Sequence, residues 1–399
     1  MKRAIFGICF TFSLLNPLES LKATPLFAVQ SSNQCGACHR PGRSEVEVWK
    51  RRCTLDCQGC HIDPNGAGPR NQWGYYFENE ALASANFFEP IDPLDDKSRF
   101  DLHYDGRIIQ RMTQDSTRTF PMNSEISMRV RPLINWIHLT YQANFLGRIG
   151  DQSLRATMND PRRFQQKYSI MIDALPFNLY LRAFRGYPVY GLRHSNHSRW
   201  IREKLGFTPY ALIDGVSFGG TPTVPFIHAT AINGNPIDKA EDKQKGFSLH
   251  GGLRGVSFGW HVHGSYWKTK SEKAEISMHA FGGGFKVADF VFMGEKNSRS
   301  VGWLNLDLEE TASYRGEAIR LNPSSNIGDY SLTYVGIPGF SLAFILEELE
   351  QLASDSQRKS IALDWHPIPY LQFEFWRRFE SGARSLVDSL VLGHIYWDF

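Results

Sequence analysis

Two C-x-x-C-H motifs stand close together near the start of the chain. They are formed by Cys35, Cys38 and His39, and by Cys57, Cys60 and His61. This spacing is the attachment pattern of haem c. The two thiols of a motif can form thioethers to the two vinyl groups of one haem, and the histidine that follows is then held beneath the iron as an axial ligand. The sequence therefore predicts two covalently attached haems c, with His39 and His61 bound to iron.

Paired cysteines at this spacing have three other uses. They can bind zinc, form disulfides in an exported protein, or act as a thioredoxin-like redox pair. None of these uses explains a histidine directly after both pairs, whereas haem attachment does. Cys53 lies between the motifs and is left without a role.

Each iron also needs a sixth ligand or an open position, and the choice sets the redox potential. Between residues 28 and 97 the only histidines are His39 and His61, and this stretch contains no methionine. A histidine or methionine ligand must therefore come from beyond residue 97. His103, the nearest in sequence, and His197 are our candidates. Arg70, after the second motif, could pair with a haem propionate.

The segment that carries the motifs follows a predicted export signal. Lys2 and Arg3 precede an apolar run of 12 residues, 4–15, which is too short to span a membrane as a helix. No later apolar run is long enough for a membrane-spanning helix either. A chain embedded in a membrane must therefore cross it as strands. We predict a signal peptide over 1–28, a short irregular or helical dihaem cytochrome c segment over 29–97, and a β-rich domain over 98–399.

The β-rich domain is predicted from alternating apolar and polar residues, the strand period. Ile137, Leu139 and Tyr141, for example, alternate with His138 and Thr140. A soluble β-sandwich or propeller and a transmembrane antiparallel barrel both show this pattern. Aromatic apolar rows, charged polar rows and a final alternating strand favour the barrel. At ~10 residues per strand plus turns, the fold is mainly β with about 16 strands, within about four.

Some segments and histidines are assigned within this pattern. Helix is expected only at 200–205 and 346–353, and loops at 233–245, 295–299 and 354–359. Histidines on the predicted lumen-facing row are His103, His138, His261, His263, His279, His366 and His394. A histidine on this row is usually a polar lining residue without a special task.

Two stretches resemble a known protein family. From His61 the chain continues through Pro64, a glycine-rich turn, Arg70 and Asn71 to an aromatic residue. This is similar to haem-attachment segments of bacterial outer-membrane cytochrome–barrel proteins. The stretch from Tyr190 to Arg193, followed by Asn196 and His197, is similar to a second segment of such proteins. The close match covers about 20 residues, and it implies an outer-membrane barrel with an N-terminal multihaem segment.

The expected function is electron transfer at or across the bacterial outer membrane, by an electron carrier rather than a catalyst. The haem segment would lie in the periplasm or in the barrel lumen. Its partners would be periplasmic or extracellular redox proteins and the lipid bilayer. With a net charge of +3, no nucleic-acid partner is expected. The alternatives are a dihaem peroxidase-type enzyme with an open iron, and a porin-like or binding barrel whose haem segment serves as a sensor or plug.

Overall fold

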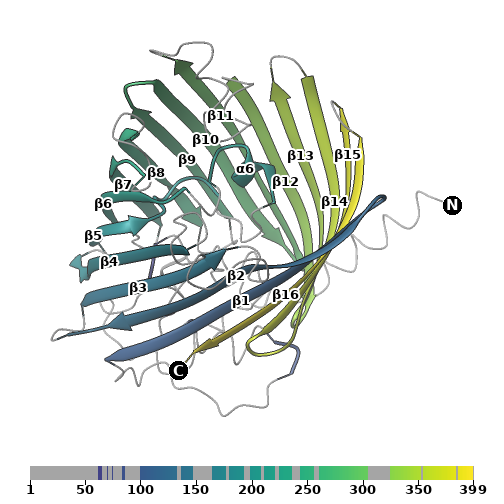
Figure 1. Ribbon diagram of the computed structural model, residues 1–399, viewed down its shortest axis with the longest axis horizontal. Coiled ribbons are helices and arrows are strands. Elements are labelled where there is room, and N and C mark those ends of the chain that lie inside the picture. The colour runs from purple at the N-terminus through teal and green to yellow at the C-terminus, as the bar shows by residue number, and fades with distance from the viewer. Residues whose placement is uncertain are drawn as a thin grey trace.

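The described residues of the computed structural model form a closed antiparallel barrel of 16 strands (Figure 1). This confirms the predicted fold class and strand number. The structure describes residues 62–64, 70, 74, 83–85, 99–132, 136–146, 164–176, 179–192, 198–207, 211–220, 224–235, 243–255, 260–303, 324–351, 354–382 and 385–398. The predicted signal peptide, the cysteines and histidines of both motifs, and His197 lie outside these residues.

The strands follow one another around the barrel in chain order, and the first pairs with the last. They are β1 (Phe100–Thr113), β2 (Thr117–Val130), β3 (Ile137–Leu146), β4 (Phe164–Leu175), β5 (Leu179–Gly186), β6 (Ile213–Gly220), β7 (Pro225–Asn233), β8 (Lys245–Gly255), β9 (Trp260–Lys270), β10 (Ala274–Val287), β11 (Phe290–Trp303), β12 (Ser324–Ile337), β13 (Phe340–Gln351), β14 (Ser354–Ile368), β15 (Leu371–Gly382) and β16 (Leu386–Asp398). β1 and β16 close the barrel as an antiparallel pair, in which Tyr104 stands opposite Trp397. Because the sheet closes, no strand edge is left unpaired.

The two ends of the barrel differ in the length of their connections. Each even-numbered strand passes to the next odd one through a short turn, such as 288–289, 338–339 or 369–370. The barrel also begins and ends at this rim, at Phe100 and Asp398. The opposite rim carries the long connections 147–163, 187–212 and 304–323. Bacterial outer-membrane barrels have short periplasmic turns and longer extracellular loops, so we call the first rim the periplasmic end.

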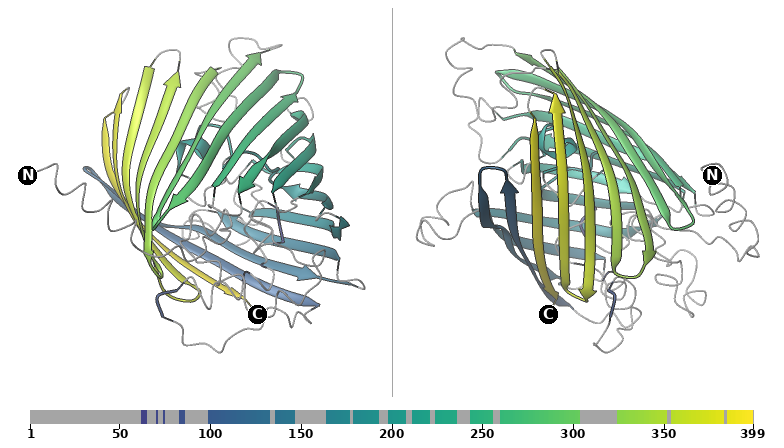
Figure 2. Two further views of the ribbon diagram at one scale, coloured as in Figure 1. Left: turned by 180° about the vertical axis from the view of Figure 1, so that it is seen from behind. Right: turned by 90° about the vertical axis from the view of Figure 1, so that its right-hand side faces the viewer.

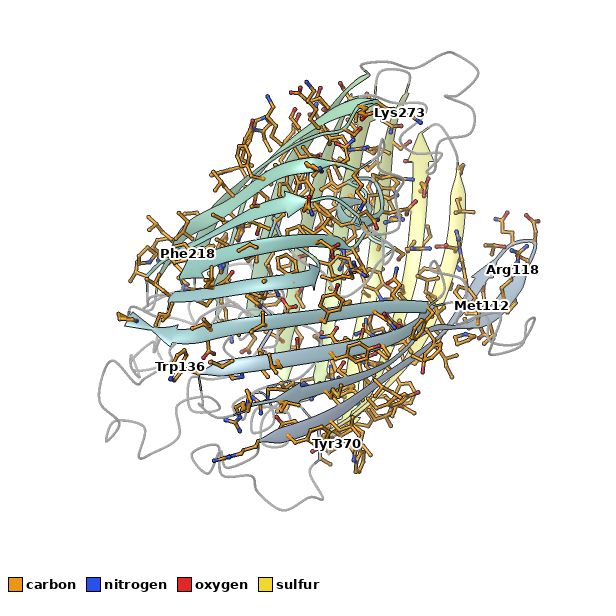
Figure 3. The ribbon with its side chains drawn as sticks, turned by 60° about the vertical axis from the view of Figure 1, so that its left-hand side comes forward. Met112, Arg118, Trp136, Phe218, Lys273 and Tyr370 are labelled. Carbon is orange, nitrogen blue, oxygen red and sulfur yellow. The ribbon has the colours of Figure 1, made fainter. Side chains whose placement is uncertain are left out.

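Alternation along each strand gives the wall an apolar outside and a polar inside. Large apolar side chains project outwards, as Phe218 shows in Figure 3. Other exposed members of this outer row are Ile108, Ile126, Ile170, Leu181, Ile227, Leu249 and Ile361. A lipid environment suits such a surface, because these side chains would be costly to expose to water.

The predicted lumen-facing histidines are mostly confirmed. Five of them are buried inside the wall: His103, His138, His261, His263 and His394. His279 is an exception, because it is exposed beside Tyr266, with ring centroids 5.0 Å apart. On this part of β10 the inner row is apolar instead, with buried Met278 and Ala280.

Three local predictions are wrong. The expected helix at 346–353 is strand as far as Gln351, in β13, and the expected loops at 295–299 and 354–359 lie within β11 and β14. These segments carry many polar residues because one side faces the lumen, where Glu347 and Arg358 form a buried pair with Nε and Oε2 2.7 Å apart. The connection at 233–245 and a short helix, α6 (Trp200–Glu203), are confirmed. Among the described residues, no helix is long and apolar enough to cross a bilayer.

The connection between β5 and β6 enters the lumen and brings α6 inside the barrel outline (Figures 1 and 2). Trp200, Ile201 and Leu205 pack there in one apolar cluster with inner-wall side chains such as Trp267 and Ile327. Arg199 Nε donates to Asp329 Oδ2 of β12 at 2.8 Å, and the Trp200 amide donates to Glu347 Oε1 at 2.6 Å. The lumen is therefore partly filled by its own chain. We call the described parts of this connection, 187–192, 198–207 and 211–212, the inserted connection.

Candidate functional site

Four histidines lie next to one another on the inner wall. His228 comes from β7, His250 from β8, and His261 and His263 from β9. His228 stands directly opposite His250 in the strand register. Ring centroids are 5.9 Å apart for His228 and His250, 5.4 Å for His250 and His263, and 5.5 Å for His263 and His261. We call these four side chains the histidine row.

Three of the four imidazoles are held by a hydrogen-bond partner. His228 Nδ1 lies 2.9 Å from the hydroxyl of Tyr180, and His250 Nδ1 lies 2.7 Å from Oγ of Ser265. His263 Nε2 lies 2.6 Å from Glu295 Oε2. By contrast, neither ring nitrogen of His261 has a partner among the described residues, although both are buried. Buried polar atoms without partners are uncommon in proteins and call for an explanation.

Glycines on the flanking strands make room for the rings. A Cβ on Gly219 of β6 would lie 2.7 Å from His228 Nδ1. On Gly282 and Gly284 of β10 it would lie 2.8 Å from Cε1 of His263 and of His261, respectively. A side chain at any of these positions would require the ring to move. The row is therefore built with the flanking backbone in close contact with the imidazoles.

The inserted connection is tied to the same site. The Gly191 amide donates to Ser265 Oγ at 2.9 Å, and the Leu192 amide donates to Glu295 Oε2 at 2.5 Å. Glu295 thus binds both the inserted connection and His263. These residues belong to the second family-like stretch, and its described part, 190–192, lies in the lumen beside the histidine row.

The residues that follow the second C-x-x-C-H motif also contact this part of the wall. Ile62 packs with Met171 of β4 and Tyr180 of β5 in a buried cluster. Asp63 Oδ1 and Arg182 Nη1 are 2.6 Å apart, and the Arg182 side chain is only 1% exposed. Tyr180 therefore contacts Ile62 on one side and His228 on the other.

Two more points of the N-terminal segment contact the periplasmic end. The Arg70 guanidinium carbon lies 4.5 Å from the ring centroid of Tyr396, on β16. The Ser84 amide donates to the carbonyl of His366 at 2.8 Å, and its hydroxyl donates to the carbonyl of Pro338 at 3.1 Å. Arg70 thus stands at the barrel wall. Its predicted pairing with a haem propionate stays a prediction.

Among the predicted iron ligands only His103 is a described residue, and it is not brought to the histidine row. His103 is buried on β1, opposite Ser127 of β2, whereas the row lies on β7 to β9. His228 and His250 were missed by the sequence reasoning. No group of three or more metal-binding side chains occurs among the described residues. The row is therefore a set of single donors rather than a self-contained metal centre.

A second polar site lies beside α6. A cavity of about 230 Å³ is lined by charged side chains that include Arg111, Lys204, Arg378 and Asp388. Within it Arg378 Nε donates to Asp388 Oδ1 at 2.7 Å and Arg111 Nε donates to Asp388 Oδ2 at 2.8 Å. Most of its charges are thus paired, and the lining of the cavity is polar rather than apolar.

Comparisons with known proteins identify the architecture. No family model and no curated protein matches the chain. Among solved structures, a loop L8 deletion mutant of OmpT, an outer membrane protein of Vibrio cholerae, is similar with 12% identity and a TM-score of 0.54, covering 75% of this chain and 99% of that one. OmpT expressed in the outer membrane of Vibrio cholerae is similar with 12% identity and a TM-score of 0.52, covering 75% and 97%. At this identity the likeness establishes the fold alone, a closed β-barrel like that of these outer-membrane proteins.

Proposed function

We propose that this chain is an outer-membrane electron-transfer protein whose barrel holds a two-haem c-type segment at its periplasmic end. One observation carries the proposal: the pairing of Asp63 with Arg182, beside the contact of Ile62 with Tyr180. Ile62 and Asp63 are the first two residues after the second C-x-x-C-H motif. A buried arginine on the inner wall is thereby neutralised by the segment predicted to carry haem, which ties that segment to the barrel.

The described residues fit the proposed cofactor. When bound, haem c supplies one-electron chemistry at a fixed site. It would be attached at Cys35 and Cys38, with His39 on the iron, and at Cys57 and Cys60, with His61 on the iron. The chain also offers buried imidazoles on the lumen wall, and His261 has two ring nitrogens without partners among the described residues. A neutral imidazole is a common axial donor to iron.

The inner wall favours an electron carrier over an open pore. The apolar cluster around Trp200 and Trp267 fills part of the lumen, which restricts solute passage. A redox protein in the periplasm could therefore donate electrons at the periplasmic end. Acceptors at or beyond the membrane would be extracellular or membrane-associated redox proteins.

The test is production of the full chain in a bacterial host with haem c maturation machinery. Outer and inner membranes are then separated and stained for covalent haem, and the intact mass is measured. We expect outer-membrane protein with two added haems. Dithionite should reduce these haems, and a reduced small periplasmic cytochrome should also reduce them. A mass equal to that of the bare polypeptide would overturn the proposal.

A porin-like barrel is the second candidate, because a cavity of about 230 Å³ with a charged lining lies beside α6. In this case the segment before β1 would serve as a plug or sensor. Single-channel recording in planar bilayers distinguishes the two functions. Steady ion conductance that is the same in a variant with all four motif cysteines changed to alanine would favour the porin.

A further inference from the structure

The outer surface of the barrel carries a groove of about 900 Å³ that crosses β10 to β15. These six strands lie side by side in the wall (Figure 1). We infer that the groove binds an anionic lipid of the extracellular leaflet. The acyl chains lie in its apolar part, and two phosphates of the headgroup contact Lys296 and Lys359. This rests on the outer-membrane location proposed above and not on the haems.

The groove is lined mainly by apolar side chains of the outer row. Phe281 of β10 is 71% exposed and Phe344 of β13 is 53% exposed, so both rings project from the wall. Phe285, Phe292 and Ile361 complete this border. Ligand sites usually measure about 300–1,000 Å³, so the groove is large enough for a ligand, and burial of acyl chains against these rings is favourable.

Glycines make the floor of the groove. Gly283 of β10 stands opposite Gly294 of β11, so two neighbouring outer positions carry no side chain. The ring of Tyr330 lies against the wall beside them. A Cβ on Gly294 would lie 2.8 Å from Tyr330 Cδ1, and a Cβ on Gly328 would lie 2.8 Å from Tyr330 Cε2. The glycines thus leave space for this ring along the wall.

Both lysines lie on the extracellular side of the apolar part. β11 runs from the periplasmic end outwards, so Lys296 is nearer the extracellular end than Phe292. β14 runs the other way, so Lys359 is nearer that end than Ile361. Ammonium groups above and apolar rings below match a lipid whose headgroup faces the cell exterior. A lipid of the periplasmic leaflet has the opposite polarity.

The protein supplies no anion to either lysine among its described residues. Both are exposed, and neither forms an ion pair or hydrogen bond with another described residue. Glu295, the carboxylate among the lining residues, is turned inwards to His263 at 2.6 Å. Unpaired charges on the lipid face of a barrel are costly away from the interfaces. The residues opposite the lysines are Phe281 and Gly328 for Lys296, and Leu346 and Phe379 for Lys359.

The spacing of the lysines suits a headgroup with two phosphates. Lys296 is on β11 and Lys359 on β14, and neighbouring strands are about 4.8 Å apart. Three such spacings place the two backbones about 14 Å apart along the wall. Each ammonium can therefore contact its own phosphate, as a point charge.

The experiment uses the full-length chain, purified from outer membranes in detergent. Native mass spectrometry measures binding of diphosphoryl lipid A and of monophosphoryl lipid A with the same acyl chains. We expect the natural protein to bind the diphosphoryl form at least tenfold more tightly. The double variant Lys296→Gln/Lys359→Gln should bind both forms alike. Lys268→Gln is the matched control, because this outer lysine already pairs with Glu275 at 2.9 Å, and it should keep the preference.

A diphosphoryl lipid A with a photoreactive group in one acyl chain locates the bound lipid. Crosslinks should fall on peptides that contain residues 281–296 or 344–361. Equal affinity for the two lipids in the natural protein would overturn the inference, as would a preference that survives in the double variant or crosslinks confined to other strands. A dimer that excludes lipid from the groove would also overturn it, in favour of a second copy of the chain.

Two further measurements separate this inference from the proposed function. Absence of the chain from the outer-membrane fraction would overturn the proposed location and this inference with it. Absence of covalent haem, read from intact mass, would overturn electron transfer alone. Heat-modifiable migration on gels verifies that each variant contains a folded barrel.

Discussion

Asp63 and Arg182 join two parts of the chain that lie more than a hundred residues apart in sequence. Their Oδ1 and Nη1 atoms are 2.6 Å apart, and Arg182 is almost completely buried. Arg182 also stacks on Phe184, with its guanidinium carbon 3.9 Å from the ring centroid. A buried arginine needs an anionic partner, since an uncompensated buried charge is costly. The residues after the second C-x-x-C-H motif supply it.

Asp63→Asn should release this part of the N-terminal segment from the wall. The neutral amide cannot compensate the charge of Arg182, and we expect cleavage within residues 29–97 by added protease to become at least tenfold faster, or about 1.4 kcal/mol in docking free energy. Limited proteolysis followed by mass spectrometry measures this. The control is Asp115→Asn, at an exposed position in the β1–β2 turn. Protease should cleave this variant at the same rate as the natural protein. Equal rates for all three proteins would contradict the expectation.

Gly191→Ala should destabilise the inserted connection. Gly191 has a φ of +56°, and an added Cβ would lie 2.7 Å from Glu295 Oε1. Left-handed backbone costs an alanine about 1–2 kcal/mol, and the carboxylate must also leave Leu192 or His263. Gly206→Ala is the matched control, because Gly206 has a φ of +88° with nothing within 4 Å of the added Cβ.

The temperature at which the barrel loses its heat-modifiable gel migration measures both glycine variants. Gly206→Ala should show only the backbone cost, and Gly191→Ala a clearly larger drop. Similar drops would mean that Glu295 moves aside without loss.

Arg358→Leu should weaken the barrel by leaving the Glu347 carboxylate buried without its charged partner. Arg358 donates to both carboxylate oxygens of Glu347 at 2.7 Å, and Glu347 is 1% exposed. Removing one partner of a buried pair costs about 3–5 kcal/mol. Unfolding in urea, followed by tryptophan fluorescence in detergent, measures the change. Lys268→Leu removes a partner of the exposed pair with Glu275, and there no measurable change is expected.

Trp200→Ala should widen the lumen. Trp200 is 3% exposed in the apolar cluster that fills part of the barrel, and its amide and ring help to position α6. Loss of the indole leaves a cavity and costs about 3–5 kcal/mol. In planar bilayers we expect more frequent or larger ion conductance than in the natural protein. Trp260→Ala, on the outer surface, should conduct as the natural protein does.

The period-two pattern predicted the barrel because one side of each strand faces lipid and the other side faces the lumen. The pattern failed where the lumen is not wet. On β10 the inner residues Met278 and Ala280 pack against the inserted connection, so apolar side chains point inwards and His279 points outwards. Similarly, 295–299 and 354–359 look like loops because their inner residues form buried ion pairs and hydrogen bonds with other strands.

The histidine row could be foreseen only in part. His261 and His263 follow the i, i+2 spacing that places two side chains on one face of a strand, so the sequence predicts both on the lumen-facing row. His228 and His250 join them through the register between β7, β8 and β9, which depends on where each strand begins after its turn. The register between neighbouring strands cannot be predicted from the sequence pattern. Gly282 and Gly284, two positions apart on the neighbouring strand, were a readable sign that bulky rings stand opposite.

Pairing of β1 with β16 has a consequence for assembly. The sheet can close only after the last strand has left the translocation machinery, because β1 and β16 are 11 residue pairs in register from His103–Asp398 to Thr113–Asp388. Arg182 becomes buried in the inner wall when the barrel closes, whereas its partner Asp63 keeps 27% of its side chain exposed. The segment that carries Asp63 can therefore dock on the wall after closure as well as before it.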